Sequence, residues 1–169
     1  MFIYFTSGTA DYMEKMRKKY ASEKVFILHG EGNTVLVHES EKKSIFATPR
    51  KYEVLDSVGE LQQKGYFVLN NIPVSDEGRP IFENRFLNRA GSIDKEPGFI
   101  AFRLLRPLDS NTYIVMTQWA GPASFEAWKT SQAFKQAHSN KGEATGVMKQ
   151  NIFNAASYVT KYSAPPDEE

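Results

Sequence analysis

Cysteine is absent from this sequence of 169 residues. Its absence excludes disulfides, a thiolate nucleophile, an iron–sulfur cluster and a cysteine-ligated zinc site. Histidine is scarce, because only His29, His38 and His138 occur, and they form neither an HxxxH nor an HExxH pair. A metal site made of several histidines would have to combine distant segments, so we do not expect one.

An excess of charge of one sign is also missing, since 21 basic and 20 acidic residues leave a net charge of +1. Nucleic acids and anionic membranes bind basic surfaces, so we expect neither as a partner. The opening MFIYF is too short for a signal peptide, and no apolar run approaches the length of a membrane span. We therefore expect a cytoplasmic protein. Its content of 41% hydrophobic residues is typical of a globular chain with one sizeable core or two half-sized units.

The first 65 residues have the pattern of a small unit of strands and helices. Apolar runs on either side of Gly30-Glu31-Gly32-Asn33 predict a β-hairpin, because such a turn supplies residues that tolerate positive φ. Apolar residues at steps of three between Tyr52 and Leu61 predict a helix. The expected order is strand Phe2–Phe5, helix Thr9–Tyr20, strands Lys24–Leu28 and Thr34–His38, a possible strand Ser44–Ala47, and helix Tyr52–Leu61.

Residues 66–163 repeat this order of elements more completely. The stretch YFVLNNIPV, Tyr66–Val74, is apolar on both faces and predicts a buried strand. In FEAWKTSQAFKQAH, Phe125–His138, the apolar register changes at Thr130-Ser131, which predicts two short helices with Ser131 capping the second. A bend there lets Trp128 and His138 point into one pocket. The other expected elements are helix Gly78–Arg89 and strands Phe99–Arg106, Thr112–Trp119 and Ser157–Ser163.

Together these elements predict an α+β protein made of two tandem ferredoxin-like units, residues 1–65 and 66–163, followed by a disordered tail at 164–169. Each unit would carry helices on one face of its sheet and leave the other face apolar and bare. Packing the two bare faces together buries both, so a single chain would form a pseudo-dimeric α+β barrel. We find no residue-level identity between the halves, so the repeat is one of layout only.

Four motifs of the second half occur together in a known family. They are the asparagine in VLNNIPV, a helix ending in ENRF, the strand sequence EPGFIAFRLLRP, and AW followed ten residues later by AH in FEAWKTSQAFKQAH. With them this half resembles the IsdG-type haem-degrading monooxygenases of the dimeric α+β barrel superfamily, which also contains the antibiotic-biosynthesis monooxygenases. Over its full length the chain resembles the HmoB-type haem monooxygenases and the targets of RNAIII-activating protein. It departs from the short family members in its paired asparagines and its N-terminal half.

The resemblance implies a role for three residues. His138 would be the proximal iron ligand, Trp128 would press on the porphyrin and ruffle it, and Asn70 would be the distal hydrogen-bond donor. Haem needs an apolar slot, an imidazole for the iron and polar donors over the open side, and this chain can supply each of them. The aromatic residues that could line the slot are Phe82, Phe86, Phe125, Trp128 and Phe134.

The choice between the paired asparagines depends on the resemblance. A pleated strand sends Asn70 and Asn71 to opposite faces, and both faces are apolar, so alternation alone does not choose. Counting back without a gap from Arg85-Phe86, which matches the family's Arg-Phe, selects Asn70. We then expect Asn71 to face the core between the sheets and to bond a neighbouring strand or loop.

Two arginines of the predicted helix could contact the ligand. Arg85 and Arg89 lie four apart, where they could meet the haem propionates. Equally, they could form a solvated face whose stems cover apolar surface, and both alternatives stay open. His29 and His38, in or beside the first-half strands, are expected to be structural or solvent-exposed.

The activity that the resemblance implies is a reductant-dependent oxidative opening of haem, which releases iron and a linear tetrapyrrole. Haem would be both substrate and cofactor, and the electrons would come from an external donor, either a reductase or a small molecule. One alternative is a cofactor-free monooxygenase of a small phenol or quinol. Another is a signalling or haem-carrying protein without turnover. The set of Asn, Trp and His favours haem degradation because a cofactor-free pocket has no need of it. We also expect a monomer, whose N-terminal unit occupies the place of a second subunit.

Overall fold

The computed structural model describes residues 1–88, 93–131 and 152–167. In these ranges the strands are β1 (Phe2–Gly8), β2 (Val25–Gly30), β3 (Thr34–Ser40), β4 (Arg50–Val58), β5 (Tyr66–Pro73), β6 (Phe99–Pro107), β7 (Thr112–Trp119) and β8 (Tyr158–Ser163). They form a closed barrel in the order β1-β3-β2-β8-β5-β7-β6-β4, and all neighbours are antiparallel.

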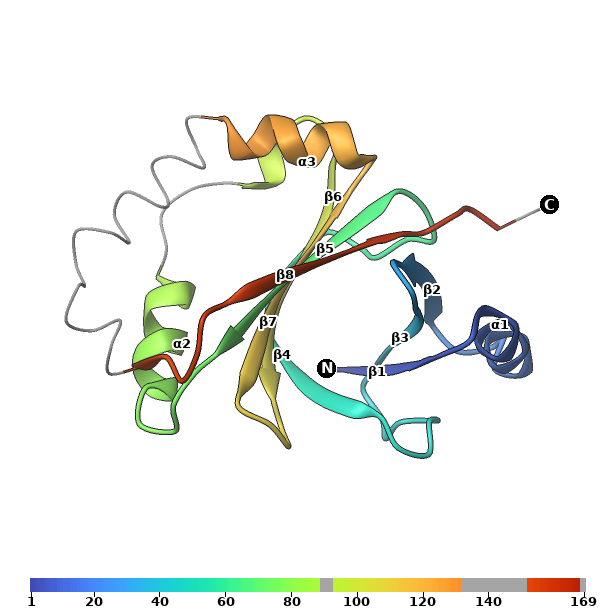
Figure 1. Cartoon of the computed structure of the whole chain (residues 1–169), viewed down its shortest axis with the longest axis horizontal. Helices are drawn as coiled ribbons and strands as arrows, with labels where there is room; N and C mark the ends of the chain where they lie inside the picture. Colours follow the sequence, from blue (N-terminus) through green and yellow to red (C-terminus); the bar gives the residue numbers. More distant parts are fainter. Residues whose placement is uncertain (89–92, 132–151, 168–169) are drawn as a thin grey trace.

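Three α-helices are described, and they lie on the outside of the barrel. They are α1 (Ala10–Lys19), α2 (Arg79–Leu87) and α3 (Pro122–Lys129), and a short 3₁₀ helix, η1, spans Ile93–Lys95. Figure 1 shows α1 on one side of the barrel and α2 and α3 on the other. The expected cap of the first helix is confirmed, because the Thr9 hydroxyl accepts a hydrogen bond from the Tyr12 N–H. No helix in the described ranges is long and apolar enough to cross a membrane.

The two halves of the chain have the same strand order. Counted within its own half, each set of four strands pairs in the order fourth, first, third, second, as β4-β1-β3-β2 and as β8-β5-β7-β6. The halves meet at the β4–β6 and β2–β8 pairs. The strands of the two halves are therefore arranged alike within the barrel.

Inward-facing side chains of both halves form one apolar core inside the barrel. Ile3 and Val37 from the first half lie in the same cluster as Phe67 and Ile114 from the second. Outward-facing side chains form separate clusters under the helices, one including Met13 of α1, one including Phe82 of α2 and one including Phe125 of α3. Strand alternation thus divides each sheet between a shared core and a helix-covered outer face.

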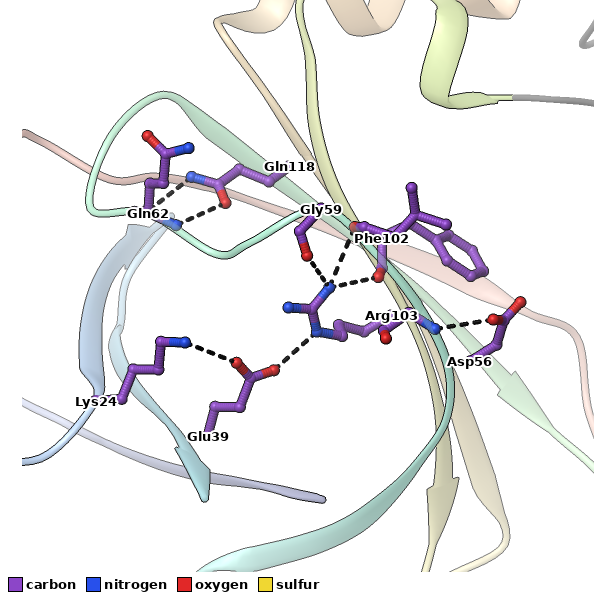
Figure 2. A network of polar contacts seen from close by, with 10 residues as sticks. Lys24, Glu39, Asp56, Gly59, Gln62, Phe102, Arg103 and Gln118 are labelled. Carbon is purple, nitrogen blue, oxygen red and sulfur yellow. Dashed lines mark hydrogen bonds and ion pairs between the residues drawn. The ribbon is translucent and has the colours of Figure 1, made fainter. Parts of the chain in front are cut away.

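A buried ion pair crosses this core from one half to the other (Figure 2). The Nε of Arg103, on β6, lies 2.8 Å from Oε2 of Glu39, on β3. The Nη1 of Arg103 donates to the carbonyl oxygen of Gly59 at 2.8 Å, and Lys24 Nζ lies 3.5 Å from the other oxygen of Glu39. A cavity of about 340 Å³ is lined in part by these same three charged side chains.

The helix predicted for Tyr52–Leu61 is wrong, because this stretch forms β4. Its register shifts between Val54 and Asp56, where a β-bulge interrupts pairing with β6. Before the bulge, Tyr52 and Val54 pack on the barrel core, whereas Leu55 and Val58 pack on the outer cluster under α2. At a bulge, the side chains that follow it switch from one face of the strand to the other. Apolar residues then recur at steps of three, which is also the spacing of a helix.

Two further predictions also need correction. The possible strand Ser44–Ala47 is a series of bends, within which Phe46 packs edge-on against the ring of His38. The tail is not disordered over residues 164–167, since Ala164 is buried and the Asp167 carboxylate pairs with Arg17 at 2.6 Å. A basic side chain at the end of α1 therefore holds a segment whose composition suggested disorder.

Candidate functional site

The outer face of β5 is the centre of the candidate site. Because side chains alternate along a strand, Asn70 shares this face with Val68 and Ile72. Val68 packs in the cluster under α3, and Ile72 packs in the cluster under α2. Asn70 therefore lies between the two outer aromatic clusters of the second half, on the face that both helices cover.

The Asn70 side chain has an unpaired oxygen atom within the described part of the chain. The residue is half-buried, and its Oδ1 atom is buried with no hydrogen bond from any residue in the described ranges. Leaving such a group unpaired typically costs about 1–3 kcal/mol. A buried, unsatisfied amide oxygen between apolar clusters is typical of a site that a ligand completes.

Asn71 is in a different environment. It is 4% exposed, and its Nδ2 donates to the carbonyl oxygens of Leu69 (3.1 Å) and Tyr158 (3.2 Å) and to Oγ1 of Thr160 (3.2 Å). The prediction that Asn71 faces the core and bonds a neighbouring strand is confirmed, because two of these partners lie on β8. Its amide is thus used by the fold.

Trp128 and Phe125 form the α3 side of the site. The ring of Trp128 is half-buried and packs on the fully buried Trp119, with centroids 5.6 Å apart and planes at 35°. Phe125 is buried beside it at 6.3 Å. Trp119 is fixed by a hydrogen bond from its Nε1 to Thr117 Oγ1 at 2.9 Å. The buried Trp119 therefore holds the ring of Trp128 in place, while part of the surface of Trp128 stays accessible.

Phe82, Arg85 and Phe86 form the α2 side. Phe82 is buried against Tyr113, with centroids 4.7 Å apart, and against Phe86 at 5.3 Å. Phe86 and Arg85 are half-buried. The helix thus presents a partly open aromatic surface with one guanidinium group beside it.

The structure brings four predicted site residues, together with Asn70, to one outer face: Phe82, Phe86, Phe125 and Trp128. Arg85 is on α2, between Phe82 and Phe86 in the sequence. His138, Phe134 and Arg89 lie outside the described residues, and so does the second of the two helices predicted after Phe125. The Ser131 hydroxyl, at the end of the described segment, donates to the Trp128 carbonyl oxygen at 2.6 Å.

Sequence reasoning did not single out Trp119 as part of the site. Its position at the end of an apolar strand is the pattern of an ordinary core residue, and its contact with Trp128 joins two separate elements. Only the pairing of β5 with β7, which sets Trp119 opposite Tyr66, brings it to this face.

Comparisons with known proteins agree with this geometry. Residues 65–140 match the family model of the antibiotic biosynthesis monooxygenases (ABM). The chain is 27% identical over 139 residues to the signal transduction protein TRAP of Staphylococcus epidermidis, covering 82% of this chain and 83% of that protein. It is 26% identical over 149 residues to a heme-degrading monooxygenase of Listeria monocytogenes, covering 88% and 85%.

Solved structures share the fold over nearly the whole chain. A structure described as a major regulator of staphylococcal pathogenesis has a TM-score of 0.84 at 20% identity, covering 97% of this chain and 99% of that one. The heme-degrading enzyme LmHde of Listeria monocytogenes has a TM-score of 0.68 at 22% identity, covering 98% and 100%. The resemblance inferred from the four motifs is confirmed, since residues 65–140 match the model of the antibiotic biosynthesis monooxygenase family.

Proposed function

We propose that this protein is a haem-degrading monooxygenase, which uses an external electron donor to open the porphyrin ring and release iron and a linear tetrapyrrole. The observation that carries the proposal is the half-buried Asn70, whose buried Oδ1 has no partner in the described ranges, between the aromatic surfaces of α2 and α3. A flat apolar ligand would cover the aromatic surfaces, and a polar group at its centre would lie beside this amide. The relative named as a heme-degrading monooxygenase supports the same assignment.

Three features of the described residues suit haem, namely two aromatic surfaces and the amide of Asn70. Phe82 and Phe86 offer an apolar edge on one side, and Phe125 and Trp128 offer another. Haem, when bound, supplies the oxygen chemistry that is directed at its own ring. Asn70 would donate a hydrogen bond on the distal side.

The other assigned residues act on binding and shape. Trp128 would press on the porphyrin face, because its contact with the buried Trp119 limits how far its ring can move. Arg85 would pair with a propionate. We assign iron ligation to His138, and further ligand contacts to Phe134 and Arg89. Haem would thus be held from both helices and from the segment that follows α3.

We also propose that the N-terminal half, residues 1–65, takes the place of a second subunit beside the haem-binding half, residues 66–163. The common strand order, the single core and the Arg103–Glu39 pair between the halves support this arrangement. The protein would then be a monomer. Light scattering should give the 19.2 kDa of one chain, and an obligate dimer of twice that mass would contradict the proposal.

A matched pair of alanine variants tests the site assignment. Asn70→Ala should bind haemin normally and lose turnover by on the order of 10²-fold, because it removes a preorganised donor. Asn71→Ala should keep turnover and lose stability by about 1–3 kcal/mol, because its three acceptors lose their donor. The reverse pattern would exclude Asn70 as the distal residue.

The proximal ligand has a separate test. His138→Ala should abolish the spectrum of bound haem. If this variant binds haemin as tightly as the parent, the iron is held elsewhere, and His29 or His38 becomes the next residue to replace.

A second candidate function is signalling, which the similarity to signal transduction protein TRAP favours, with or without haem carriage. Haemin titration followed by a reductant separates the candidates. A Soret band that forms and then decays supports degradation. A band that forms and persists supports haem carriage, and no band at all favours a cofactor-free monooxygenase or a signalling role without haem.

A further inference from the structure

Helix α2, which carries part of the proposed haem site, has little that holds it in place by itself. It has nine residues, no side chain caps its N-terminus at Gly78, and Phe82 is its buried residue. A helix of this length is marginal in isolation, so tertiary contacts must fix its position.

Glu83 supplies the ion-pair contact of this helix with the barrel. The guanidinium of Arg106, on β6, donates two hydrogen bonds to the carboxylate of Glu83, from Nε to Oε2 at 3.0 Å and from Nη2 to Oε1 at 2.5 Å. The hydroxyl of Tyr113, on β7, donates to Oε2 of the same carboxylate. The hydrogen bond from Arg106 holds the pKa of Glu83 below its usual range, so the carboxylate is charged at neutral pH.

The other side of Arg106 reaches the first half of the chain. Its Nη1 donates to Oε1 of Glu53 at 2.8 Å, and Glu53 lies directly opposite Arg106 in the pairing of β4 with β6. The guanidinium therefore has one carboxylate from each half. Two-point binding fixes the direction as well as the distance of a carboxylate.

The first turn of α2 is held separately. The Arg79 guanidinium lies over the ring of Tyr113 at 5.3 Å and donates to the carbonyl oxygens of Pro107 at 2.8 Å and Ser110 at 3.3 Å. Glu83 is one turn further along, next to the buried Phe82. Its contact thus sets the part of the helix that carries Arg85 and Phe86.

We infer that Glu83 is a positioning residue of the haem site, which acts with Arg106 and Glu53 to fix α2 over the face that carries Asn70. This inference depends on the proposed function for the identity of the ligand. It gives the N-terminal half a part in the site, through a side chain of β4. Because Arg106 and Glu53 are partly exposed, their ion pair contributes little to global stability, and its loss is expected to act locally on α2.

Hydrogen exchange without haem tests the anchoring of α2. Glu83→Gln has nearly the same shape as the parent and should speed exchange of the amides in residues 79–87 by about tenfold, while the barrel strands keep their protection. Glu53→Gln should speed it by about threefold, and the double variant should match Glu83→Gln alone, because both act through Arg106. Glu41→Gln, which removes an exposed partner of the N-terminal amine, is the matched control and should change nothing in α2. Unchanged exchange in α2 of Glu83→Gln overturns the inference.

Haemin titration of the same four variants tests the link to the site. Glu83→Gln should bind about tenfold more weakly than the parent with a displaced Soret maximum, and Glu41→Gln should bind like the parent. Faster exchange in α2 together with parental haemin affinity and spectrum would overturn the positioning role. A parent protein that binds no haemin would overturn the proposed function, and the exchange result would still decide whether Glu83 anchors α2.

Discussion

Replacing Arg103 with methionine should show how strongly the two halves depend on their buried ion pair. Arg103 and Glu39 are each 5% exposed, and they join β6 to β3 across the barrel core. Methionine keeps most of the length and the apolar character of the arginine stem and removes only the guanidinium. The carboxylate of Glu39 would then stay buried with Lys24 as its remaining partner, 3.5 Å away and half exposed.

The size of the effect follows from these contacts. Removing one partner of a buried pair typically costs about 3–5 kcal/mol, because the other charge stays buried and uncompensated. Lys24 offsets part of that charge, so we expect the low end, about 3 kcal/mol. The carbonyl oxygens of Gly59 and Phe102 also lose a donor, at 2.8 Å each. Water from the adjoining cavity can hydrate them, so we add only about 1 kcal/mol for both.

Urea unfolding followed by circular dichroism measures this cost. With a slope near 2 kcal/mol per molar urea, the midpoint of Arg103→Met should fall by about 2 M. The double variant Arg103→Met with Glu39→Met removes both charges and should come back to within about 1 kcal/mol of the parent. A single variant that loses less than about 1 kcal/mol, or a double variant less stable than the single one, would show that the buried charge of Glu39 does not depend on Arg103.

Other consequences can be measured directly. Trp128→Phe should keep haem bound but slow its degradation, and equal turnover would make Trp128 a core residue only. Burial lowers the pKa of His38, so the folded state resists its protonation, and stability should be full above pH about 6.5 and fall below it. The Glu23 carboxylate lies 3.8 Å from His38 Nε2. His38→Phe should make the free energy of unfolding, measured in urea at pH 5.5 and at pH 8, less dependent on pH. Gly65→Ala should lose about 2 kcal/mol or more, since Gly65 has a φ of 75° and a Cβ there would strike the Trp119 carbonyl.

The fold was largely predictable because local patterns and the global arrangement agree. The hairpin of β2 and β3, helices α1 and α2, and the strands of the second half all have turn or periodic signals of their own. The main exception was β4, whose bulge moves Val58 from the core face to the outer face, where Leu55 also lies. A bulge is set by pairing with β1 and β6, and no local signal in the sequence announces it.

The candidate site was predictable only where a motif marks it. Asn70 was chosen by counting along a motif; it lies on the outer face of β5 with Val68 and Ile72, and its role stays a prediction. Trp119 and Glu83 were missed because their partners lie on other elements, and distant pairing cannot be read from residue type alone. The hydrogen bond from Arg106 to Glu53 is a clear case, since 53 positions separate the two residues along the chain.

The most direct test of haem degradation is a single-turnover experiment on the full-length protein. One equivalent of haemin is added, the Soret band is recorded, and ascorbate is supplied in air with catalase and an iron chelator present. Our account predicts a Soret band that decays, with the appearance of a linear tetrapyrrole and one equivalent of chelated iron per haem. A band that never forms, or one that survives the reductant without release of iron, would contradict it.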